Sequence, residues 1–151
     1  MKISKPILII IGFIVVAGVL FIASRNKTNG PAAPSPAGQS SKWETKTSEQ
    51  AAVTVEVTPV DLSQQASEWK FDVVLNTHSV ELNQDMAQVA ALVDDQGKQY
   101  QPLAWEGAAP GGHHREGSLI FKPITPTPKS LELKISNIGD AGVRSFAWQI
   151  Q

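Results

Sequence analysis

The sequence contains no cysteine. This absence excludes disulfide bonds, thiolate zinc sites, thiol catalysis and lipid attachment through a cysteine. The common catalytic motifs are missing too. There is no Gly-x-Ser-x-Gly nucleophile elbow, and the glycine-rich stretch Pro110–Gly112 lacks the Lys-Ser/Thr pair of a phosphate-binding loop. We therefore expect a protein that is not an enzyme.

A clustered basic surface is missing from the C-terminal two thirds of the chain. Residues 51–151 carry seven Lys and Arg against twelve Asp and Glu, a net charge of −5, whereas residues 1–50 carry six against two, a net charge of +4. An acidic domain argues against nucleic acid as a partner, because phosphate binding needs a basic face. It also argues against a domain that lies flat on an anionic membrane.

One long apolar run lies near the start of the chain, from Pro6 to Ala23, without a charged residue. A run of about 18 residues or more is long enough to cross a bilayer as a helix. A cleaved signal peptide is the alternative, but bulky Phe21 and Ile22 stand where a cleavage site needs small residues. Residues 1–24 therefore predict an uncleaved, single-pass transmembrane anchor.

The flanking charges set the expected topology. Lys2 and Lys5 precede the apolar run, and Arg25 and Lys27 follow it. The short lysine-bearing N-terminus most simply stays in the cytoplasm, so we expect a cell-membrane protein whose C-terminal domain lies on the extracytoplasmic side. Residues 25–50 are rich in Pro, Ser and Gly and predict a flexible linker, which leaves residues 51–151 for the folded domain.

The rest of the chain alternates between apolar and polar residues in short runs. Val53, Val55 and Val57 share one face of such a run, and prolines and glycines separate the runs. The segment 87–93 fits a strand, although its alanines also fit a short helix. We predict an all-β fold: an immunoglobulin-like antiparallel β-sandwich of about seven strands, preceded by one N-terminal transmembrane helix. The expected strands are 52–58, 69–75, 87–93, 99–103, 118–121, 130–135 and 144–150.

Several short motifs occur together in this domain: Thr77–Val80, Asp94–Tyr100, Pro102–Gly107 and Pro110–Gly117, the last reading Pro-Gly-Gly-His-His-Arg-Glu-Gly. With them the domain resembles uncharacterised membrane-anchored or secreted β-sandwich domains of bacteria and archaea. The resemblance covers residues 52–151. It implies the sandwich fold and no activity.

All three histidines fall within these motifs: His78, His113 and His114. The loop after Thr77 and the loop before His114 are expected to meet at one end of the sandwich. Imidazoles that converge can bind copper or zinc, with Glu116 as a further ligand. The alternative is structural: Gly111 and Gly112 form a tight turn, His and Arg donate to backbone carbonyls, and Glu116 pairs with Arg115.

The sequence thus favours a membrane-tethered extracytoplasmic binding or interaction module. Its partner would be another envelope protein, contacted through Trp105, Arg115 and Glu116, because aromatic and arginine side chains are common interface anchors. Two alternatives stay open: a periplasmic or extracellular copper- or zinc-binding protein that uses the histidines, and an accessory subunit of a membrane complex. No cofactor is established by the sequence, and neither is the oligomeric state.

Overall fold

The computed structural model describes residues 42–150. The predicted anchor and most of the predicted linker lie outside these residues. Within residues 42–150, the structure has no helix long and apolar enough to cross a membrane.

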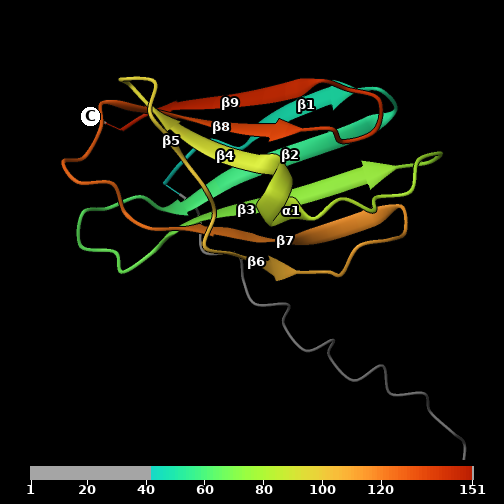
Figure 1. Cartoon of the computed structure of the whole chain (residues 1–151), viewed down its shortest axis with the longest axis horizontal. Helices are drawn as coiled ribbons and strands as arrows, with labels where there is room; N and C mark the ends of the chain where they lie inside the picture. Colours follow the sequence, from blue (N-terminus) through green and yellow to red (C-terminus); the bar gives the residue numbers. More distant parts are fainter. Residues whose placement is uncertain (1–41, 151) are drawn as a thin grey trace, which may run out of the picture. The chain divides into compact units, whose positions relative to one another are not determined.

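Two antiparallel sheets form the domain, which confirms the all-β prediction (Figure 1). One sheet has the strand order β1-β2-β3-β7-β6, and the other has the order β5-β4-β8-β9. The five strands of the first sheet are β1 (Lys46–Gln50), β2 (Val53–Asp61), β3 (Trp69–Thr77), β7 (His114–Phe121) and β6 (Ala104–Gly107). The four strands of the second are β5 (Gln99–Tyr100), β4 (Ala90–Asp94), β8 (Ser130–Ser136) and β9 (Val143–Gln149).

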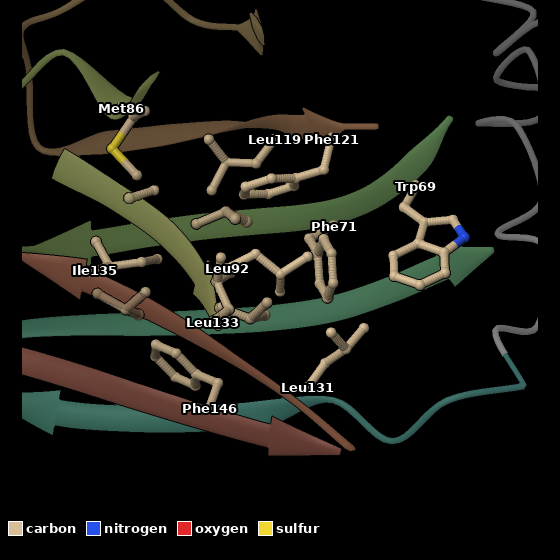
Figure 2. Close-up of a cluster of buried hydrophobic side chains, with 14 of the residues drawn as sticks. Trp69, Phe71, Met86, Leu92, Leu119, Phe121, Leu131, Leu133, Ile135 and Phe146 are labelled. Atoms are coloured by element: carbon tan, nitrogen blue, oxygen red, sulfur yellow. The ribbon is translucent and has the colours of Figure 1, made fainter. Parts of the chain in front are cut away.

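The alternating pattern places one face of each sheet in a shared core. Val53, Val55 and Val57 of β2 are buried, as are Leu131 and Leu133 of β8 in the other sheet. Because successive side chains of a strand point to opposite faces, β2, β3, β8 and β9 give about every second residue to the core. Figure 2 shows this cluster between the strands, with Trp69 towards one side and Met86 towards the other.

The sequence allowed either a strand or a short helix for residues 87–93, and the structure contains both. Met86–Val89 forms the single helical turn α1, and β4 follows directly from Ala90. The side chain of Asp85 accepts a hydrogen bond from the Ala87 N–H and so caps the turn. The helix begins at this cap, and Met86 anchors it because its side chain is fully buried.

The folded domain begins earlier than the sequence predicted. Lys46–Gln50, assigned above to the linker, forms β1 and pairs with β2. Two residues of β9 hold this polar strand from the opposite sheet. The Arg144 guanidinium donates to the carbonyls of Ser48 (3.0 Å) and Gln50 (2.6 Å), and the Trp148 indole N–H donates to the carbonyl of Glu44 (2.8 Å).

Replacing Arg144 with methionine is therefore expected to loosen β1. The guanidinium is buried, and its loss leaves main-chain oxygens of β1 without their charged donor. We expect a loss of about 2 kcal/mol in the free energy of unfolding, with faster hydrogen exchange in β1 and unchanged exchange in β3. Uniformly faster exchange across both strands would contradict this local role.

The loops gather at two ends of the domain. The histidine end is formed by the loops 78–85, 108–113 and 137–142. The opposite end, the Trp69 end, is formed by the loops 62–68 and 122–129. Register fixes this assignment: Asn76 pairs with His114 at one end, and Trp69 pairs with Phe121 at the other. The chain reaches the sandwich at the Trp69 end, where Lys42 and Trp43 line a hollow with Leu62.

Candidate functional site

The two loops that carry the histidines meet at the histidine end, as predicted. The Thr77 N–H donates to the carbonyl of His113 (3.0 Å), and the Leu82 N–H donates to that of Gly112 (3.0 Å). The Gly111 N–H donates in return to the carbonyl of Leu82 (2.9 Å). These main-chain bonds join the 78–85 and 108–113 loops into one surface.

Gly111 and Gly112 make the turn that allows this contact. Their φ angles are +123° and +74°, in the region that residues with a Cβ rarely adopt. The tight turn that the sequence suggested for Gly111 and Gly112 therefore forms.

Arg115 lies beneath this surface, and its side chain is only 1% exposed. Its Nη1 donates to the carbonyls of Leu82 (3.0 Å) and Gln84 (2.7 Å), and its Nη2 donates to that of Ala108 (3.1 Å). One guanidinium thus ties the loop 78–85 to the loop 108–113. The sequence proposed Arg115 as a contact for a partner, and its burial corrects that prediction: it supports the surface from inside.

Burial lowers the pKa of Arg115, because the interior disfavours its charged form, and the nearby Asp85 carboxylate raises it again. Arginine still keeps its proton, since its ordinary pKa lies far above physiological pH. The surface at the histidine end therefore rests on a permanent buried charge.

Trp105 covers one side of this guanidinium. The Arg115 Cζ lies 5.7 Å from the centroid of the Trp105 ring, a distance typical of a cation–π contact. The indole N–H donates to the carbonyl of Ala108 (3.0 Å), which also accepts from Arg115. Trp105 packs against the core but is only partly buried, so part of its side chain stays open to solvent.

Two glycines make room for the Trp105 ring. Gly107 of β6 lies opposite Gly117 of β7. A Cβ on Gly117 would stand 2.5 Å from the Cα of Gly107 and 2.7 Å from the Trp105 ring. Sequence reasoning did not identify this pair, although the final glycine of the Pro110–Gly117 motif was part of the pattern.

The three histidines are all exposed. His114 Nδ1 lies 2.6 Å from the Asn76 side-chain oxygen, and its Nε2 lies 3.7 Å from a carboxylate oxygen of Glu116. Glu116 therefore approaches His114, and the predicted pairing of Glu116 with Arg115 does not form. In residues 42–150 the structure shows no group of three or more His, Asp or Glu side chains placed to hold a metal ion. Copper or zinc binding stays a prediction.

Alanine at His78, His113 or His114 is expected to change the free energy of unfolding by no more than about 0.5 kcal/mol, because exposed side chains contribute little to stability. Chemical denaturation followed by tryptophan fluorescence measures this. A loss above 2 kcal/mol at His113 would contradict a purely superficial position for its imidazole.

Comparison of the chain with protein-family models, curated proteins and solved structures finds no match. The resemblance to membrane-anchored β-sandwich domains stays a prediction.

Proposed function

We propose that this protein is a membrane-tethered extracytoplasmic binding module whose histidine end contacts another envelope protein. The module has no catalytic role. The single observation that carries the proposal is the position of the joined loops, at the end of the sandwich opposite to the point where the chain arrives.

The order of strands supports an immunoglobulin-like arrangement of the sandwich. Such domains have a sheet of order A-B-E-D against a sheet C-F-G. Here β2-β3-β7-β6 follows the first order and β4-β8-β9 follows the second, with β5 as an added strand beside β4. The strand β1 is then an extra N-terminal strand beside the A position.

This extra strand changes which end faces the tether. It runs from the Trp69 end to the histidine end, so the loops equivalent to B–C, D–E and F–G lie far from Lys42 and Trp43. In variable domains the B–C and F–G loops are among those that bind antigen. A linker that joins an anchor to Lys42 would present these loops away from the membrane.

The histidine end also has the build of a contact surface. Its exposed side chains include His78, Glu81, His113 and Glu116, and they stand on a base fixed by Arg115. Binding residues are commonly carried on loops that a rigid scaffold positions. The buried guanidinium of Arg115 supplies that rigidity and does not itself touch the partner.

The proposal is tested by site-specific photo-cross-linking of the full chain in the cells that make it. The substitution His113→p-benzoylphenylalanine places the probe at the histidine end, and Gln96→p-benzoylphenylalanine places it in an exposed turn at the Trp69 end. We expect an adduct with one envelope protein from position 113 and none from position 96. Absence of an adduct at 113, or equal adducts at both positions, would overturn the proposal.

Protease treatment of intact spheroplasts tests the compartment. We expect the C-terminal domain to be digested or released from outside. Full protection of the domain until the membrane is broken would place it in the cytoplasm and overturn the proposed topology.

A further inference from the structure

The two outer edges of the five-stranded sheet, β1 and β6, differ in whether side chains cover their main-chain groups. At the β1 edge, the carbonyls of Glu44, Ser48 and Gln50 accept hydrogen bonds from Trp148 and Arg144 of the other sheet. Side chains thus occupy main-chain groups that would otherwise be open to another strand. An edge covered in this way is protected against strand addition.

The β6 edge has no such cover along its middle. The Ala108 N–H donates to the carbonyl of Glu116 (3.0 Å), so residue 108 belongs to the hydrogen-bonded set that faces β7. In an antiparallel pair this set alternates along the strand. The N–H and C=O groups of Trp105 and Gly107 therefore point away from β7, towards the outer side of the sheet where Figure 1 shows no further strand.

The exposure of Gly107 agrees with this reading. Gly107 is exposed, and its Cβ position is closed by the backbone of Glu116 and Gly117 and by the Trp105 ring. Since glycine has no side chain, the surface it exposes is its main chain. Of the devices that guard an edge, lysine and proline are absent from the four residues of β6, and the only charge that the strand carries is that of Glu106.

We propose that β6 receives an extended, lysine- or arginine-bearing segment of the partner, which adds to this sheet as an antiparallel strand. The inference rests on the proposed function, because it names how the partner of the histidine end engages the domain. Strand addition to an exposed edge is a recurrent way to bind peptides, in which main-chain bonds give affinity and side-chain contacts give specificity.

Charge selects a basic segment. Glu106 of β6 and Glu116 of β7 have exposed carboxylates, 62% and 72% exposed. Lys70 lies between Glu68 (3.6 Å) and Glu106 (3.7 Å) and so does not neutralise both. Arg115 and Arg144 are buried, so the described surface offers seven lysines against fourteen Asp and Glu residues. A cationic side chain opposite Glu106 would meet an acidic surface.

An apolar contact is available beside the charge. Leu103 immediately precedes β6 and is 63% exposed, one of two large hydrophobic side chains of residues 42–150 that are left so open. A partner strand along Trp105 and Gly107 would pass this side chain. Alternating cationic and apolar residues therefore suit the edge.

The test uses the full chain in nanodiscs and a capped eight-residue peptide of alternating lysine and valine. Hydrogen exchange is measured at single residues. In the free protein we expect the amides of Trp105 and Gly107 to exchange fast and that of Glu106 to exchange slowly. The peptide is expected to slow exchange at Trp105 and Gly107 about tenfold, as new main-chain hydrogen bonds would. The same peptide N-methylated on alternate residues should give no protection.

Charge reversal supplies the matched variants. Glu106→Lys is expected to weaken binding of the lysine–valine peptide about tenfold, since like charges then face each other. The control is Glu132→Lys. Like Glu106, Glu132 lies in a strand and its carboxylate approaches a lysine, here Lys134 at 3.4 Å, but it belongs to the other sheet. That variant should bind as the unmodified chain does.

Three results would overturn strand addition: no protection of Trp105 and Gly107 by the peptide, equal binding of the N-methylated peptide, or slow exchange of these amides in the free protein because a second copy already pairs with β6. If position 113 still gives its cross-link in these cases, the proposed function stands and only the mode of engagement is wrong. If position 113 gives no adduct, the proposed function itself fails, whatever the peptide does.

Discussion

Replacing Arg115 with methionine is expected to lower the free energy of unfolding by about 4 kcal/mol, the upper range for a single substitution. Methionine fills much of the volume but donates no hydrogen bond. The carbonyls of Leu82, Gln84 and Ala108 would lose their charged donor, the first in a buried contact and the other two in partly buried ones. Urea denaturation followed by tryptophan fluorescence measures the change.

Two further variants show whether the forked geometry or the charge matters. Arg115→Lys keeps the charge but has one compact head group, which cannot reach carbonyls in both loops as a planar fork does. We expect it to lose about half as much stability as Arg115→Met, roughly 2 kcal/mol. Lys122→Met, at an exposed cation, is the control and should be nearly neutral. A loss below 1 kcal/mol for Arg115→Met would show that the loops hold each other without the guanidinium.

Most of the strands could be predicted because their buried residues alternate with polar ones in a pattern that is visible within a few residues. The alternation of Val53, Val55 and Val57, or of Leu131 and Leu133, needs only neighbouring residues to be recognised, and both runs are buried as the pattern requires. Such features depend on interactions within a few residues of the chain.

The role of Arg115 could have been predicted in part. Gly117, Leu119 and Phe121 share its parity along β7, so a strand that begins at His114 places Arg115 on the buried face. The apolar run alone predicts a strand that begins at Ser118, which places Arg115 in a loop where it could contact a partner. What no pattern could give is the acceptors, because Leu82 and Gln84 lie more than thirty residues away along the chain.

Strand β1 shows the same limit more strongly. Lys-Thr-Ser-Glu-Gln has no apolar alternation and reads as linker. It forms a strand because Arg144 and Trp148, about a hundred residues later, bond its carbonyls and that of Glu44. Local preference for a strand is weak compared with such tertiary contacts. The closed and open edges of the sheet, on which the proposed strand addition depends, were therefore outside what the sequence could reveal.

Replacing Gly117 with alanine is expected to separate β6 from β7 and to lower the free energy of unfolding by about 3 kcal/mol, since overpacking against backbone cannot be relieved by a rotamer change. The new Cβ would stand 2.5 Å from the Cα of Gly107, 2.6 Å from the carbonyl of Glu106 and 2.7 Å from the Trp105 ring. Displacement of Trp105 would also uncover the Arg115 guanidinium, so the two loops should loosen together with the strand.

The control for this substitution is Gly142→Ala, because a Cβ at Gly142 meets nothing within 4 Å. Denaturation should leave that variant within about 0.5 kcal/mol of the unmodified chain. Hydrogen exchange then separates two origins of the loss at Gly117. Faster exchange confined to β6 and to the loops 78–85 and 108–113 supports a close backbone approach that holds the histidine end together. Equal acceleration in β8 and β9 would contradict it, because the damage would then have spread through the common core.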